Sequence, residues 1–73
     1  MPDLLRSEPS EGARNLSRLV FDFHADDVAR MSLEQASNAR KRILAKVPGA
    51  DRMADGPLYE LLQRLEAQIL RFR

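Results

Sequence analysis

The chain has 73 residues, with 12 Lys and Arg against 11 Asp and Glu and no Cys. That length allows one domain, and the net charge of +1 gives no strong field to draw the protein to nucleic acid or acidic lipid. The lack of cysteine excludes a disulfide framework and a thiolate metal site. The apolar residues are mostly Leu and Ala, which favour helices over strands.

Targeting signals are not evident in the sequence. The chain has no apolar run near the roughly 18–20 residues that span a membrane. Residues 1–12 lack the basic segment followed by an apolar one that marks a signal peptide. The Arg-rich, Lys-poor usage is typical of GC-rich bacterial genomes. We therefore expect a cytoplasmic, bacterial protein.

Residues 1–12 combine Pro, Ser, Gly and acidic residues, a composition typical of a flexible tail. We expect the single helical domain to occupy residues 13–73. Its first helix is predicted over residues 13–30, with Ser10 as a plausible N-cap. Phe21 lies off the apolar stripe of that helix, so it should be exposed or touch a second surface. The stripe consists of Leu16, Leu19, Val20 and Phe23, at helical spacing.

A strand is the rival interpretation of residues 18–24. Leu19, Phe21 and Phe23 would share one side at a period of two, although Val20 breaks the alternation. No later segment offers a partner strand. Such a strand could pair only across a dimer, as in ribbon-helix-helix repressors.

A second helix is predicted over residues 32–47. Ser32 and Gln35 have the spacing of a capping box, and the Pro48-Gly49 pair should end the helix. Its small residues Ala36 and Ala39 would let another helix approach closely. The apolar positions are Leu33, Ala36, Ala39, Ile43, Leu44 and Val47.

A third helix is predicted over residues 56–72, after a connector of residues 48–56. Asp55 is its expected N-cap, and Pro57 is tolerated in the first turn. Glu60 and Arg64 form an i,i+4 pair. The apolar stripe is Leu58, Leu61, Leu62, Leu65, Ile69 and Phe72. The expected fold class is therefore all-α, as a small three-helix bundle or a helical hairpin with an N-terminal helical arm.

The sequence contains little evidence for a catalytic site. The only His is His24, which lies near Asp22 and Asp26 but does not share a helix face with Asp22. The serines lack a neighbouring base, and the three glycines are too scattered to form a phosphate-binding loop. We expect no enzyme activity, no catalytic residue, no cofactor and no metal.

A basic cluster is the main electrostatic feature. It consists of Arg40, Lys41, Arg42 and Lys46. These cations are possible phosphate contacts for nucleic acid, but they also lie where the end of a helix favours positive charge. The alternative function is therefore a small DNA-binding regulator of ribbon-helix-helix type.

The leading hypothesis is a non-enzymatic protein–protein interaction module: a small helical adaptor, co-chaperone or regulator that acts through its amphipathic C-terminal helix. Chains below about 70–80 residues rarely build a sufficient core alone, so we expect a homo-oligomer, most simply a homodimer, or a complex with another protein. Phe21, Tyr59, Leu70 and Phe72 should remain outside the core. The predicted interface comprises Val20, Phe21, Phe23, Leu58, Tyr59, Leu61, Leu62, Leu65, Ile69 and Phe72.

Overall fold

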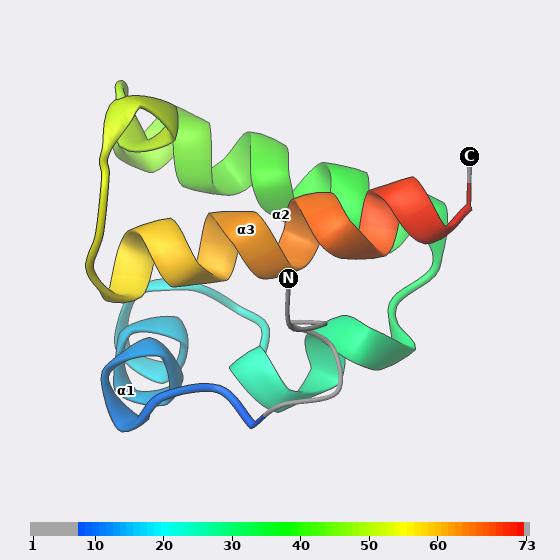
Figure 1. Ribbon diagram of the computed structural model, residues 1–73, viewed down its shortest axis with the longest axis horizontal. Coiled ribbons are helices and arrows are strands. Elements are labelled where there is room, and N and C mark those ends of the chain that lie inside the picture. The colour runs from blue at the N-terminus through cyan, green and yellow to red at the C-terminus, as the bar shows by residue number, and fades with distance from the viewer. Residues whose placement is uncertain (1–7, 73) are drawn as a thin grey trace.

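The computed structural model describes residues 8–72, and this part of the chain is helical with no strand (Figure 1). The predicted all-α class is confirmed. Three α-helices and two short 3-10 helices follow one another within residues 8–72. They are α1 (Glu11–Val20), η1 (Ala25–Arg30), α2 (Leu33–Lys46), η2 (Ala50–Arg52) and α3 (Pro57–Arg71).

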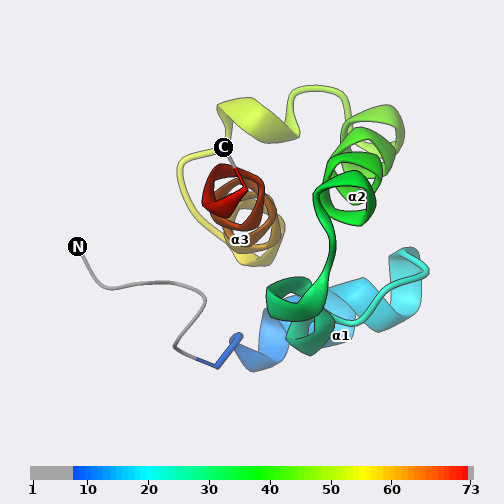
Figure 2. The ribbon, with the colours of Figure 1, turned by 90° about the vertical axis from the view of Figure 1, so that its right-hand side faces the viewer.

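α2 and α3 form an antiparallel hairpin, and α1 and η1 lie together against one side of it (Figures 1 and 2). The connector that contains η2 joins α2 to α3 at one end of the hairpin. We call the other end, where α2 begins and α3 ends, the open end. α3 contacts α1, η1, α2 and η2, so it is the central helix of the bundle.

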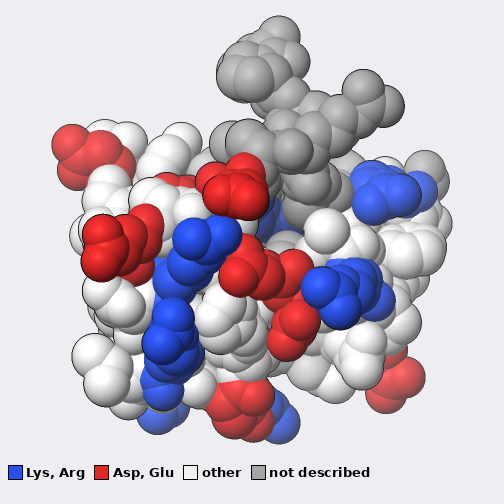
Figure 3. Space-filling view, turned by 90° about the horizontal axis from the view of Figure 1, so that it is seen from below, with Lys and Arg blue, Asp and Glu red and all other residues white. Residues whose placement is uncertain are grey.

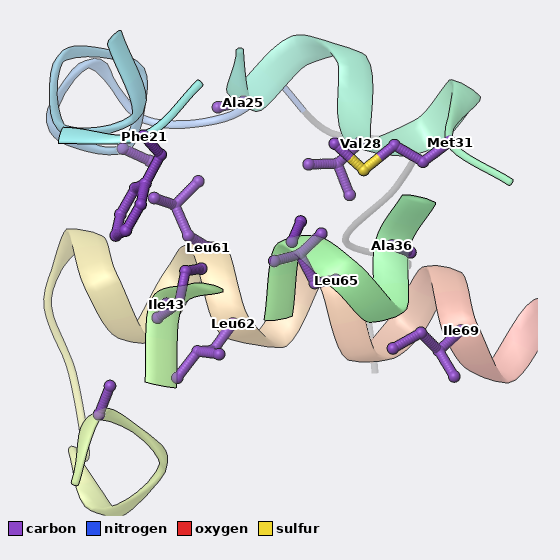
Figure 4. Packing of buried hydrophobic residues seen from close by; sticks show 13 residues of the cluster. Phe21, Ala25, Val28, Met31, Ala36, Ile43, Leu61, Leu62, Leu65 and Ile69 are labelled. Atoms are coloured by element: carbon purple, nitrogen blue, oxygen red, sulfur yellow. The ribbon is translucent and has the colours of Figure 1, made fainter. Parts of the chain in front are cut away.

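The hydrophobic core forms where the other four elements face α3 (Figure 4). The small side chains of Ala36 and Ala39 are buried, which agrees with a close approach of α2 to α3. The predicted inner stripe of α3 is confirmed for four of its residues. The buried apolar residues are Ala13, Phe21, Ala25, Val28, Met31, Ala36, Ala39, Ile43, Ala50, Leu61, Leu62, Leu65 and Ile69.

The predicted first helix is wrong in its second half. α1 ends at Val20, Phe21 is extended with φ −119° and ψ 163°, and a separate 3-10 helix follows from Ala25. The break turns Phe21 into the core, where it is only 8% exposed, and η1 then buries Val28. Continuing the helix would leave the Phe21 ring off the apolar stripe, so hydrophobic burial outweighs the local preference for a helix.

Three further expectations for this region are wrong. Residues 18–20 are helical and residues 21–24 form no strand, so the strand interpretation of residues 18–24 is wrong. Leu19 was expected on the buried stripe, but it is exposed, and α1 instead buries Ala13 and Ser17. Phe21, expected outside the core, belongs to it.

The start of the domain also differs from the expectation. α1 begins at Glu11, inside the predicted tail, and Pro9 is buried. Residues 1–7 of that tail lie outside the described residues. Ser10 is the N-cap as predicted, because its side chain accepts a hydrogen bond from the Ala13 N–H.

Caps define the limits of α2 and α3. The predicted Ser32–Gln35 capping box is confirmed in both of its hydrogen bonds. Gly49 follows α2 with a φ of +89°, a conformation that favours glycine. The predicted Asp55 cap is wrong, because Gly56 holds the N-cap position with a φ of +101° and Pro57 is the first helical residue.

Candidate functional site

The inner face of α3 supplies much of the predicted interface, and it is covered within the chain. Leu61, Leu62 and Leu65 are at most 1% exposed, and Ile69 is also buried. Leu61, Leu62 and Leu65 cannot contact a partner while the bundle is folded. Their periodicity is therefore explained by the core of a single chain.

Three of the four aromatic residues of the predicted interface, Phe21, Phe23 and Tyr59, are buried or half-buried. The rings of Phe21 and Phe23 are stacked, with centroids 5.8 Å apart and an interplanar angle of 20°. The Lys46 Nζ lies 5.9 Å from the centroid of the Phe21 ring. Leu58 and Tyr59, at the start of α3, are half-buried. These residues offer edges to a partner, not a continuous apolar surface.

Exposed large apolar side chains lie elsewhere on the described surface. Leu19 is 85% exposed and is followed by Val20 at the end of α1, whereas Leu70 is 66% exposed and Phe72 53% exposed at the end of α3. Leu33 begins α2 and therefore also lies at the open end of the hairpin (Figure 1). Of the predicted interface residues, only Val20 and Phe72 are therefore exposed. Leu70 was expected outside the core but was not included in the predicted interface.

A groove runs between α2 and α3 toward the open end. We call it the α2–α3 groove, and its lining residues are Ser37, Arg40, Lys41, Glu66, Ile69 and Leu70. The Nε of Arg40 donates to Glu66 Oε1 across the two helices, at 3.3 Å. Within residues 8–72, Lys41 is exposed and forms no hydrogen bond or ion pair. The groove thus combines apolar side chains with an unpaired cation.

The basic cluster has its charges mostly engaged. Arg42 forms an ion pair with Asp22, whose pKa is lowered by the hydrogen bond from that guanidinium. Lys46 Nζ donates to the carbonyl of Val20 at 2.9 Å, so it satisfies an acceptor at the end of α1. Only Lys41 among the four predicted nucleic-acid contacts has no such partner in the described part of the chain.

The surface of α1 and η1 shows the same mixture of charge. On the part of this face that the structure describes, acidic and basic side chains lie next to one another and neither sign gathers into a patch (Figure 3). Arg14, for example, pairs with Asp26 at 3.2 Å and with Glu8 at 3.6 Å. A single-signed surface of the kind that tracks a phosphate backbone is not found on this face.

His24 has a local structural role. It is the N-cap of η1, and its Nδ1 accepts a hydrogen bond from the Asp26 N–H at 3.1 Å. The two flanking acids form ion pairs with different arginines: Asp22 pairs with Arg42, and Asp26 pairs with Arg14. Among the described residues, no group of three or more acidic or histidine side chains is placed to hold a metal ion.

Buried polar side chains connect the elements, and the sequence interpretation missed most of them. Gln68 donates through Nε2 to the carbonyl of Met31 at 2.7 Å and to that of Ala29 at 3.3 Å. Ser17 Oγ accepts from the Ala25 N–H at 3.1 Å, which connects α1 to η1. Every buried side-chain polar atom in residues 8–72 has a partner, so none is left over to bind a ligand.

Glu60 connects the start of α1 to α3. Its carboxylate accepts from the Ser10 N–H at 2.9 Å and from the Nε of buried Arg64 at 3.3 Å, which confirms the predicted i,i+4 pair. Burial alone would raise the pKa of Glu60, but the hydrogen bonds from Ser10 and Arg64 together lower it below its usual value. These groups stabilise the fold by joining the start of α1 to α3.

Comparison with protein-family models, with characterised proteins and with solved structures found no significant match to this chain. Across residues 8–72, none of the helices has the length and apolar character needed to cross a membrane. The candidate functional site is therefore inferred from the geometry of this structure alone.

Proposed function

We propose that this protein is a non-enzymatic protein–protein interaction module that binds another polypeptide at the open end of its α2–α3 groove. The observation that carries the proposal is the exposure of Leu70, at 66%, beside a groove that also contains Ile69. Large apolar side chains clustered around a groove and rimmed by polar residues are typical of protein interaction sites.

This proposal keeps the C-terminal helix as the binding element but changes the face of it that binds. The inner residues Leu61, Leu62 and Leu65 hold the bundle together, whereas Leu70 and Phe72 on the last turns remain accessible. Leu33, at the start of α2, extends the apolar surface at the same end of the hairpin. A partner would cover these side chains without unfolding the domain.

The DNA-binding alternative has no observation in its favour. It needs a paired strand at residues 18–24, where the structure has the end of a helix and an extended turn. It also needs free cations, whereas Arg40, Arg42 and Lys46 are held by groups of the same chain.

The test compares two exposed leucines at different places on the fold. Leu70→Asp should abolish capture of protein partners from an extract of the source cells, while Leu19→Asp, the matched control at the end of α1, should leave capture unchanged. Both variants should keep the wild-type thermal melt, because both side chains are exposed. If Leu70→Asp melts normally and captures the same proteins as the wild type, the proposed site is wrong.

A further inference from the structure

We propose that the occupant of the α2–α3 groove is an amphipathic helix with acidic residues beside its apolar stripe, contributed by a different polypeptide. This inference rests on the proposed function and adds the chemistry of the partner. Three observations support it: the position of the groove between two antiparallel helices, the charge of the groove and the charge beside the chain's own exposed leucines.

The first observation is the position of the groove. α1 and η1 contact α3 on one side of the hairpin, and η2 contacts both α2 and α3 at the connected end (Figure 2). Other hollows lie where α2 meets η1 and the end of α1, but the α2–α3 groove is the one that lies between the two antiparallel helices and reaches toward the open end. The ridges of a third helix fit such a groove, and the small side chain of Ser37 allows its backbone to come close.

The second observation is the charge of the groove. Its lining residues include two cations, Arg40 and Lys41, and one anion, Glu66. Glu66 is already engaged by the Nε of Arg40, and Lys41 has no ion pair within residues 8–72. A partner with carboxylates next to its apolar residues would pair with Lys41, whereas a basic partner would be repelled.

The third observation separates a different polypeptide from a second copy of this chain. The two most exposed leucines of the described surface, Leu19 and Leu70, each have an exposed arginine as their neighbour, Arg18 and Arg71 respectively. A copy that docked through either leucine would bring another cation toward Lys41. The charges therefore favour a heterologous, acidic helix.

The experiment uses two fluorescent peptides of about 14 residues, roughly four helical turns, with leucines at helical spacing. One carries Glu at the flanking positions and the other carries Lys at the same positions. Fluorescence anisotropy with the full chain should give about tenfold tighter binding of the Glu peptide at low ionic strength. Added salt should reduce this preference, because the charges lie at the surface.

Charge reversal at one position provides the matched control. Lys41→Glu should remove or invert the preference for the Glu peptide, whereas Arg18→Glu changes the net charge equally on α1 and should preserve it. Leu70→Asp should abolish binding of the Glu peptide while the thermal melt stays unchanged.

The outcomes distinguish this inference from the proposed function. If the Lys peptide binds as tightly as the Glu peptide and Leu70→Asp abolishes both, the groove binds helices but the acidic partner is wrong. If light scattering shows a dimer that Leu70→Asp dissociates, the occupant is a second copy and the inference is overturned. If neither peptide binds, or binding ignores Leu70→Asp, while Leu70→Asp still abolishes capture from the extract, the inference fails and the proposed function stands. If capture also ignores Leu70→Asp, both proposals fail.

Discussion

Replacing Gln68 with leucine should destabilise the fold, although a leucine would look natural on a buried helix face. Gln68 is 2% exposed, and its Nε2 donates to the carbonyls of Met31 and Ala29 at 2.7 and 3.3 Å. These bonds join α3 to the segment that leads from η1 into α2. Leucine has a similar volume but no donor, so both carbonyls would lose their partner.

The magnitude follows from the burial of the two hydrogen bonds. The bond to Met31 is buried, and leaving a buried acceptor unsatisfied costs about 1–3 kcal/mol. The bond to Ala29 is partly exposed, so water can replace it at a cost of up to about 1 kcal/mol. The added apolar surface of leucine offsets about 1 kcal/mol. We expect a net loss of about 2 kcal/mol in the free energy of unfolding, or a fall of about 8–16 °C in Tm for a domain this small.

The assay is thermal and urea unfolding followed by far-UV circular dichroism. Gln63→Leu is the matched control, because Gln63 lies on the same helix, is half-buried and forms no hydrogen bond through its side chain within residues 8–72. Its free energy of unfolding should change by less than about 0.5 kcal/mol. Equal stability of Gln68→Leu and the wild type, or equal losses in the two variants, would show that the buried hydrogen bonds do not stabilise this fold.

Three further variants test the core, a helix cap and an acidic group. Leu65→Ala should lower the free energy of unfolding by about 2–5 kcal/mol in urea titrations, whereas Leu70→Ala should change it by less than about 0.5 kcal/mol. Ser32→Ala should cost about 1 kcal/mol in the same titration, because it removes the capping box, and an equal cost for Ser37→Ala would contradict that reason. Although burial acts to raise it, hydrogen bonds hold the pKa of Glu60 below the usual 4.5, so its stabilising contribution is present above that pH and is lost as the pH falls through the lowered value. Glu60→Gln should therefore be less stable than the wild type at neutral pH and approach it in acid; a difference that does not vary with pH would exclude this linkage.

Local signals in the sequence predicted much of α2 and α3. The Ser32–Gln35 capping box and the position of Pro57 in the first turn depend on bonds within a few residues, so they could be identified without the fold. The stripe Leu61, Leu62, Leu65 and Ile69 identified the buried side of α3 for the same reason. The periodicity could not indicate whether that side faces its own chain or a partner, because both environments require the same apolar spacing.

The region between α1 and α2 shows where local signals fail. Residues 19–23 contain apolar residues at spacings that suit both a helix and a strand, and neither describes the result. Phe21 leaves the helix because the space beside α3 and α2 accepts its ring, and that space is made by residues distant in the sequence. Lys46, from the end of α2, then caps the carbonyl of Val20.

Some features of the candidate site could likewise be predicted from the sequence, whereas others depend on the tertiary structure. By itself, the sequence determined that the chain would be helical, where its last two helices would lie and that Leu70 and Phe72 would be left outside the core. Only the tertiary structure decided that Leu61, Leu62 and Leu65 face the chain's own core, that Arg40 meets Glu66, and that Lys41 remains unpaired within the described residues. Caps and helical periodicity arise from neighbours along the chain, whereas burial and ion pairing depend on which remote segments come together in space.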